Sequence, residues 1–165
     1  MKRIVAVILL LCIGLSGCKV LEARIKDPVT FYYLQKEYSY GGTGSILAPE
    51  IRETYGEHRD LTYLLALYLV GPNDEEHTMP LPSGTKITST VQENGTIVLT
   101  LSDVAQGMSE AELTLACACL SRTCFDFTDA KKVTVQLGER SISMTRSNLL
   151  LSDDNVNKAI MEEKE

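Results

Sequence analysis

Three cysteines in the second half of this 165-residue sequence, Cys117, Cys119 and Cys124, are residue types suited to chemistry. As thiolates they could bind zinc. Their segment is predicted to be helical, however, and on a helix Cys117 and Cys119 point about 200° apart, so they cannot share one ion. Cys117 and Cys124 lie on one face but roughly 10 Å apart along the axis, which is too far for a disulfide. We interpret all three as buried small apolar residues; a disulfide to Cys124 would require the helix to end near Leu120.

A second candidate is the run Asp74-Glu75-Glu76-His77, which offers three carboxylates and an imidazole to a divalent cation. The run has no glycine at a tight-turn position and no regular spacing of oxygen ligands, so a solvated loop is the favoured interpretation. The chain has two histidines, His58 and His77, and neither lies in an HExxH or GxSxG motif. No spacing specifies a Ser-His-Asp arrangement. The sequence therefore predicts a protein that is not an enzyme and needs no metal or cofactor.

Four tyrosines, Tyr32, Tyr33, Tyr38 and Tyr40, precede a glycine-rich stretch at positions 41–44. Tyrosine joins a large apolar ring to a polar hydroxyl, which suits contacts with carbohydrate or protein. About half of these four side chains are expected to pack in the core or on a sheet face. Tyr38 and Tyr40, in a predicted loop, are the candidates for a partner or ligand surface.

The N-terminus has the features of an export signal. Lys2-Arg3 is followed by an apolar run, Ile4–Leu15, which is too short to span a bilayer but suits a signal-peptide core. The run ends in Leu15-Ser16-Gly17-Cys18, which resembles the lipobox of bacterial lipoproteins. That resemblance implies cleavage before Cys18 and acylation of Cys18, and two or more acyl chains anchor a protein stably. An ordinary signal peptide with a chance cysteine is the alternative.

Cleavage there would leave 148 residues and change the formal charge from −6 to −8, because Lys2 and Arg3 are lost. An acidic domain is repelled by anionic lipid and by nucleic acid, so we expect the lipid to provide the anchoring and no nucleic-acid partner. We predict a signal peptide at residues 1–17, a lipidated tether at 18–27, a single domain at 28–151 and an acidic tail at 152–165.

Two segments that follow the tether are predicted to be extended. Val29–Leu34 is rich in β-branched and aromatic residues and is predicted to be a strand. Ile46–Glu53 alternates weakly and contains Pro49, which favours an edge strand or an extended loop.

A helix is predicted over Leu61–Val70, with Asp60 as its N-cap; Thr54-x-x-Glu57 is a competing capping box that would start it earlier. The helix is apolar almost all round, so we expect it to be covered on most sides. Gly71-Pro72 ends it, because glycine can adopt the left-handed conformation and proline blocks continuation.

A second helix is predicted after the capping box Ser109-x-x-Glu112. Its apolar residues recur at helical spacing and form one stripe facing the core: Leu113, Ala116, Cys117, Leu120 and Cys124.

The hairpin around Asn94-Gly95 can be drawn in two registers. A three-residue loop, Glu93-Asn94-Gly95, pairs Val91 with Ile97 and puts the apolar residues of both strands on one face. A two-residue turn at Asn94-Gly95 pairs Val91 with Val98 and puts them on opposite faces. We predict the three-residue loop.

The last two strands, Lys132–Leu137 and Ser141–Met144, are joined by a tight turn at Gly138-Glu139. A two-residue loop there pairs Val135 with Ile142 and aligns the apolar faces. The element order is roughly β-α-β-β-α-β-β, with Ile46–Glu53 as a further weak strand. This order predicts an α+β fold with a mostly antiparallel sheet and two helices packed on one face.

The succession of segments resembles the GerMN domain, over roughly Val29 to Thr145. The most specific pieces are LVGP at 69–72 and LPSGTK at 81–86, in that order with a short loop between them. FYYLQ at 31–35, ILAPEIRE at 46–53 and KKVTVQLGE at 131–139 also fit. GerM-like proteins often carry two such domains, whereas one is found here, and the pair Cys117-x-Cys119 is not part of the family pattern.

The resemblance implies an extracytoplasmic lipoprotein of a spore-forming Gram-positive bacterium, with a non-enzymatic binding or assembly role in sporulation or germination. No catalytic residues are carried over. We expect lipid anchoring on the outer face of the cell membrane and a protein partner in the envelope or spore membranes. Edge strands such as Ile46–Glu53 or Ser141–Met144 are the expected contact sites. The alternatives are a glycan-binding lipoprotein that uses the tyrosine-rich loop, and an envelope hydrolase; the oligomeric state is not predicted.

Overall fold

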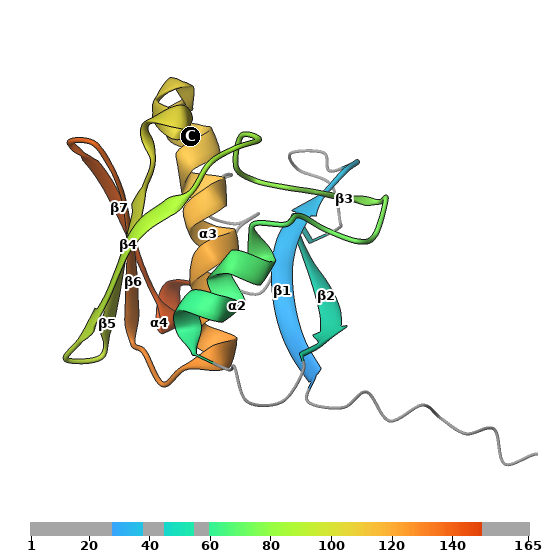
Figure 1. Cartoon of the computed structure of the whole chain (residues 1–165), viewed down its shortest axis with the longest axis horizontal. Helices are drawn as coiled ribbons and strands as arrows, with labels where there is room; N and C mark the ends of the chain where they lie inside the picture. The colour runs from blue at the N-terminus through green and yellow to red at the C-terminus, as the bar shows by residue number, and fades with distance from the viewer. Residues whose placement is uncertain (1–27, 38–44, 55–59, 150–165) are drawn as a thin grey trace, which may run out of the picture.

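The computed structural model describes residues 28–37, 45–54 and 60–149, which form one layered domain (Figure 1). None of the helices in these ranges is long and apolar enough to cross a membrane. The longer elements, in chain order, are β1 (Pro28–Gln35), β2 (Leu47–Glu53), α2 (Leu61–Tyr68), β4 (Ile87–Glu93), β5 (Thr96–Leu101), α3 (Glu110–Phe127), β6 (Lys132–Leu137) and β7 (Arg140–Thr145). The described residues also form three short elements: β3 (His77–Thr78), the 3-10 helix η1 (Asp103–Gly107) and α4 (Arg146–Leu149).

The fold class is α+β and mostly antiparallel, as predicted, but the strands divide between two sheets rather than one. A three-stranded sheet has the order β2-β1-β3, and a four-stranded sheet has the order β4-β5-β6-β7. The helix α3 lies between them and contacts β1 on one side and β6 and β7 on the other (Figure 1). The prediction that both helices cover one face of a single sheet was therefore wrong in this respect.

A hydrogen bond joins β1 to α3, the helix that separates it from the larger sheet. The N–H group of Tyr32 donates to the hydroxyl Oγ1 of Thr123 on α3, at 2.9 Å. A backbone donor that could have bonded to another strand is thus satisfied by a helix side chain. Thr123 is fully buried, so this contact is part of the core.

The larger sheet contains one parallel pair, β5 with β6. Parallel neighbours need a long crossover connection, usually a helix, and here η1 and α3 provide it. The inner face of the larger sheet carries four side chains that are fully buried against the helices: Ile97, Leu99, Val133 and Val135. The hairpin of β6 and β7 has the predicted register, with Val135 opposite Ile142.

The register predicted for the hairpin of β4 and β5 was wrong. The structure pairs Val91 with Val98 across the two-residue turn Asn94-Gly95. Both turn residues have positive φ, 49° and 74°, as in the primed turns that match strand twist. A bulge between Ile87 and Ser89 then lets Ile87 lie opposite Leu101, while Val91 stays on the outer face, 43% exposed. Turn chemistry and the bulge thus set the register, rather than apolar alignment.

The helix α2 begins as predicted, because the side chain of Asp60 accepts a hydrogen bond from the N–H group of Tyr63 at 2.9 Å. It is not covered on most sides, however. Leu64, Leu65 and Tyr68 form one buried stripe, whereas Val70, just beyond the helix, is 77% exposed. Some of the apolar side chains of this segment therefore lie outside the core.

The helix α3 matches the prediction closely. Ser109 and Glu112 make the reciprocal hydrogen bonds of a capping box, and the five residues of the predicted stripe are all buried. The helix continues to Phe127, so the condition for a disulfide at Cys124 is not met. Cys119 is also fully buried, on the side facing away from that stripe, because α3 is enclosed by both sheets.

Candidate functional site

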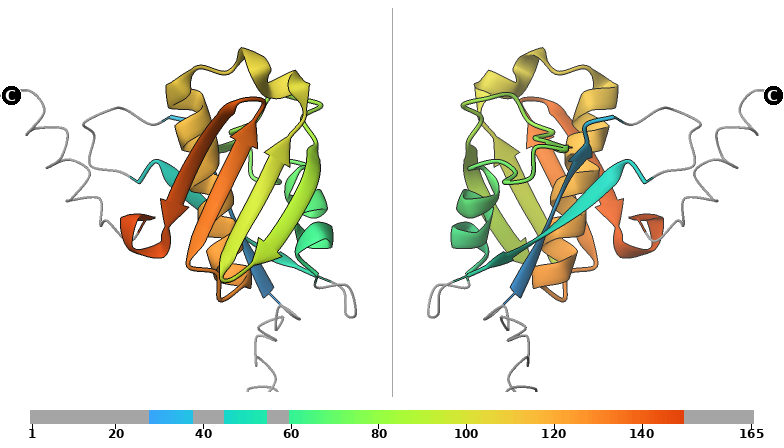
Figure 2. Two further views of the ribbon diagram at one scale, coloured as in Figure 1. Left: turned by 90° about the vertical axis from the view of Figure 1, so that its left-hand side faces the viewer. Right: turned by 90° about the vertical axis from the view of Figure 1, so that its right-hand side faces the viewer.

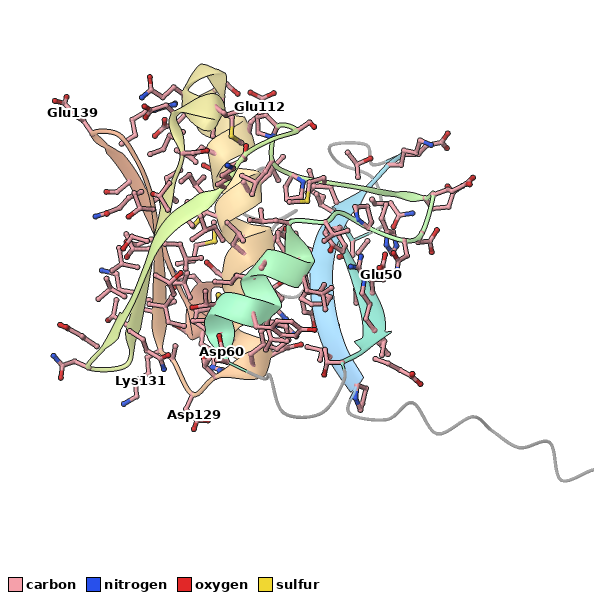
Figure 3. The ribbon with its side chains drawn as sticks, viewed as in Figure 1. Glu50, Asp60, Glu112, Asp129, Lys131 and Glu139 are labelled. Carbon is pink, nitrogen blue, oxygen red and sulfur yellow. The ribbon has the colours of Figure 1, made fainter. Side chains whose placement is uncertain are left out.

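A cluster around the carboxylate of Glu50 is one region of interest; we call Glu50, Arg52 and the loop 71–77 the Glu50 clamp (Figure 3). Oε1 of Glu50 accepts from Nε of Arg52 at 2.5 Å and from the N–H group of Asn73 at 3.0 Å. Oε2 accepts from the N–H group of Asp74 at 3.2 Å and lies 3.3 Å from Nδ1 of His77. The loop after α2 is thereby wrapped around a nearly buried carboxylate.

Arg52 connects this carboxylate to the aromatic core. Its guanidinium lies over the rings of Phe31 and Tyr33, at 5.2 and 5.5 Å from their centroids, and Nη2 donates to the carbonyl oxygen of Gly71. The hydroxyl of Tyr33 donates to the carbonyl oxygen of Tyr68 at 3.0 Å, and the two rings stack at 4.8 Å. The carbonyls at the end of α2, which have no partners within the helix, are satisfied in this way.

The Glu50 clamp is built for structure rather than for catalysis. Burial alone would raise the pKa of Glu50, but hydrogen bonds from the N–H groups of Asn73 and Asp74 and from Arg52 outweigh it and hold the pKa below its ordinary value. A carboxylate that already accepts hydrogen bonds from three donors is a poor general base. Its function in the fold is to hold the Gly71-Pro72 corner, where Gly71 has a φ of 98°.

The run Asp74–His77 is therefore only partly the solvated loop that was predicted. Its three acids are exposed, but the imidazole of His77 is only 11% exposed and is turned towards Glu50. Within residues 28–37, 45–54 and 60–149, no group of three His, Cys, Asp or Glu side chains is placed to hold a metal ion.

The three cysteines are buried and unpaired, as interpreted from the sequence. Burial raises the pKa of each thiol, to about 12 for Cys124, so the thiolate needed for metal binding or nucleophilic attack is disfavoured. Sγ of Cys117 lies 3.5 Å from the carbonyl oxygen of Ile142 and donates to it weakly. Cys117 thus packs α3 against β7, and all three cysteines are part of the buried surface of the helix.

Cys18, Tyr38 and Tyr40 lie outside the described residues, so lipidation and the tyrosine surface stay predictions. Of the other two tyrosines, Tyr33 is fully buried. The hydroxyl of Tyr32 donates to Asp126 at 2.9 Å, and the guanidinium of Arg122 lies 5.1 Å from its ring centroid. Both of these side chains thus pack within the domain.

The outer face of the four-stranded sheet is the second region of interest (Figure 2, left). Strand pairing aligns its outward residues in rows of four across β4, β5, β6 and β7. We call these rows the hydroxyl face; two of them are uncharged, namely Ser89, Thr100, Gln136 and Ser141, and Val91, Val98, Thr134 and Ser143. A third row contains Glu93, Thr96, Lys132 and Thr145.

The hydroxyl face is unusual for its low charge. Charged residues make up 23% of the chain, whereas two of the three rows have none and the third has Glu93 and Lys132 at one end of the face. Hydroxyl groups satisfy one another across the strands, as in the 2.8 Å contact between Thr134 and Ser143. Depletion of charge on an exposed face is the compositional signal of an interface core. The alternation of residues along β5, β6 and β7 predicts this face from the sequence. The wrong register for β4 assigned Ser89 and Val91 to the inner face, so the contribution of that strand was missed.

Comparison with known proteins agrees with this architecture. Residues 30–143 match the model of the Germane family, described as sporulation and spore germination. No curated protein matches the sequence.

Two solved structures from Bacillus subtilis share the fold. The tandem GerMN domains of the sporulation protein GerM are 16% identical with a TM-score of 0.52, over 75% of this chain and 43% of that one. The first GerMN domain alone is 16% identical with a TM-score of 0.50, over 70% of this chain and 85% of that one. This chain thus spans less than half of the tandem structure, and the likeness at this identity concerns the fold.

Proposed function

Since this chain belongs to the Germane family of sporulation and spore germination, we propose that it is a lipid-anchored, non-enzymatic binding module of the cell envelope. The single observation that carries the proposal is the family match over residues 30–143. In this proposal Cys18 carries the lipid, and the domain binds a protein partner on the outer side of the cell membrane, in the sporulation or germination programme.

The composition of the two regions supports a binding role. Among the described residues, Glu50 and the three cysteines are used in packing, and no group of three His, Cys, Asp or Glu side chains is placed to hold a metal ion. The hydroxyl face, by contrast, offers an outward surface in which two of three rows are uncharged, beside the edge strand β7. Such a surface can exclude water from a partner without the cost of burying charge.

The anchor is tested by replacing Cys18 with alanine in the full-length chain and separating membranes from the soluble fraction. We expect the natural chain in the membrane fraction and the Cys18→Ala variant released or retained as an uncleaved precursor. Replacing Cys12 with alanine is the matched control, since it lies within the predicted signal peptide. Equal membrane recovery and equal processing of all three chains would contradict lipidation at Cys18.

The binding role is tested by crosslinking in sporulating cells, with the full-length chain as bait. We expect an envelope or sporulation protein that is lost when Val98 and Thr134, at the centre of the hydroxyl face, are both replaced by lysine. Lysine at exposed Glu93, at the margin of that face, is the control. Prey that is recovered equally with both variants would contradict a role for this face.

Glycan binding is a second candidate, because seven outward residues of the three rows carry hydroxyl groups that could hydrogen-bond to a polysaccharide. The three rows contain no aromatic ring, and aromatic rings are what sugar-binding surfaces commonly stack against, so this candidate is the weaker one. Pull-down of the full-length chain on purified cell wall distinguishes a protein partner from a glycan. If the natural chain is retained on cell wall and the variant with lysine at Val98 and Thr134 is not, the result would favour glycan binding.

A further inference from the structure

The strand β7 ends the four-stranded sheet and exposes one side of its backbone. The N–H group of Arg146, just after the strand, donates to the carbonyl oxygen of Lys131 at 3.1 Å, on the β6 side. In an antiparallel strand, residues alternate between bonding to the neighbour and pointing away from it. Even-numbered residues of β7 therefore face β6, whereas Ser141, Ser143 and Thr145 direct their N–H and C=O groups outward. No backbone bond from another element reaches the outward groups of Ser141 and Ser143 among the described residues. Thr145 directly precedes α4 and accepts from the N–H group of Asn148 through its hydroxyl, so its C=O belongs to the first turn of that helix and only its N–H group is available.

The other long edges carry features that discourage strand pairing. β2 contains Pro49 and the inward-pointing charges Glu50 and Arg52, and β4 contains the bulge at Ile87/Ser89. Prolines, bulges and inward charges are the means by which proteins protect edges. The strand β7, with the sequence RSISMT, has no proline and no bulge, and its one charged residue is Arg140 at its first position.

The side chains of β7 are complementary to themselves. In an antiparallel pair centred on Ser143, Ser141 lies opposite Thr145 of the second copy, on the outer face. On the inner face, Ile142 lies opposite Met144, so apolar residues meet apolar residues. The outward groups of Ser141 and Ser143, with the N–H group of Thr145, would make about four hydrogen bonds by the antiparallel pattern.

Charge favours this edge over the rest of the surface. The chain has a formal charge of −6, so two copies repel each other over much of their surfaces. β7 itself contains no carboxylate. The pairing would place Arg140 opposite Arg146, but both are turned back onto their own domain: Arg140 donates to the carbonyl of Met108 at 2.7 Å, and Arg146 to that of Phe125 at 2.7 Å. Strand pairing there does not force two free cations together.

We propose that two copies of this chain pair through β7, antiparallel about Ser143, and join their hydroxyl faces into one eight-stranded sheet. The symmetry is two-fold, so each copy uses the same residues. The pairing does not rest on the proposed lipid anchor, because the backbone groups of β7 are available with or without it.

The test uses the position of Ser143 on the symmetry axis. Two differently tagged full-length chains are expressed together, and one is recovered through its tag while the other is measured. When both copies carry Ser143→Lys, or both carry Ser143→Glu, like charges lie directly opposite, and we expect recovery to fall at least about fivefold. When one copy carries lysine and the other glutamate, we expect recovery to return to near the natural level, which also shows that both variants fold.

The matched controls are Val91→Lys and Val91→Glu, on the same face but on the opposite edge strand, and we expect them to pair like the natural chain. The proposal would be overturned if the natural chain is not recovered with its second copy, or if Ser143→Lys pairs as well as the natural chain. It would also be overturned if the mixed pair is recovered no better than either variant alone.

Discussion

The Glu50 clamp and the hydroxyl face lie on opposite sides of α3 and use their side chains in opposite ways (Figures 1 and 3). The clamp gathers a carboxylate, a guanidinium, an imidazole and a stacked pair of tyrosines, which are the residue types of many active sites. The polar atoms of Glu50, Arg52 and Tyr33 bond to other parts of the same domain. The hydroxyl face contains almost no reactive groups and leaves its outward surface open.

The difference teaches that reactive residue types do not by themselves mark a functional site. A buried charged group must be paired, and in pairing it becomes part of the scaffold. Uncharged residues on an exposed sheet cost little to cover, so they remain available to a partner. We therefore expect changes in the clamp to alter stability and changes on the face to alter association.

The largest expected effect comes from replacing Glu50 with alanine. Arg52 is 8% exposed and would be left without its carboxylate, as would the N–H groups of Asn73 and Asp74. We expect the free energy of unfolding to fall by about 3 kcal/mol, measured by urea denaturation. The control Glu93→Ala, on an exposed strand end, should change it by less than about 0.5 kcal/mol. A loss below about 1 kcal/mol at Glu50 would mean that the clamp does not hold the loop.

Acid should remove part of the same stabilisation. The pKa of Glu50 is lower in the folded chain than its ordinary value of 4.5, so the unfolded chain binds more protons between the two values. The contribution is fully present above about pH 4.5 and is lost as the pH falls through the folded pKa. We expect the stability difference between the natural chain and Glu50→Gln to shrink over this window, measured by urea denaturation at several pH values.

The carboxyl of Glu112 provides the comparison, because its pKa is also lowered, by hydrogen bonds from the N–H group and then the hydroxyl of Ser109. Since Glu112 is fully exposed, we expect Glu112→Gln to change the loss of stability at acid pH less than Glu50→Gln does. An equal change with both variants would show that burial in the clamp adds nothing.

A smaller effect is expected for Tyr33→Phe. The ring stack on Tyr68 is kept, but the hydrogen bond to the carbonyl of Tyr68 is lost, which should reduce the free energy of unfolding by about 1 kcal/mol. Tyr32→Phe, whose hydroxyl bonds to Asp126 in a partly exposed position, is the matched control with the smaller expected loss. If the control loses more, the hydroxyl of Tyr33 is not a significant link between the clamp and α2.

The smallest effect on stability is expected on the hydroxyl face. Thr134→Val removes the 2.8 Å contact with Ser143 but keeps the shape and the β-propensity of the residue. We expect a change within about 0.5 kcal/mol in urea denaturation. A loss comparable to that of Glu50→Ala would mean that the face is a structural layer rather than a free surface.

Much of the local structure was readable because it depends on neighbours in sequence. The capping box at Ser109, the N-cap at Asp60 and the turn at Gly138-Glu139 are set within a few residues, and the structure confirms each. The register at Asn94-Gly95 was missed although its signal was local, because apolar alignment was given more weight than the primed-turn preference of Asn-Gly. The bulge that reconciles the two has no strong signal in the sequence.

The sequence by itself determined most of the longer helices and strands, the burial of the cysteine stripe on α3 and the family of the chain, because these follow from short-range patterns of residue type. It did not indicate the short elements β3, η1 and α4. Only the tertiary structure decided that the strands form two sheets around α3, and that Glu50 and Arg52 point inward. The partners of Glu50, at positions 73, 74 and 77, are more than twenty residues away, and no local pattern encodes such a contact. A charged residue in an edge strand is ordinarily read as exposed, and only the folded chain supplies the donors that allow it to be buried.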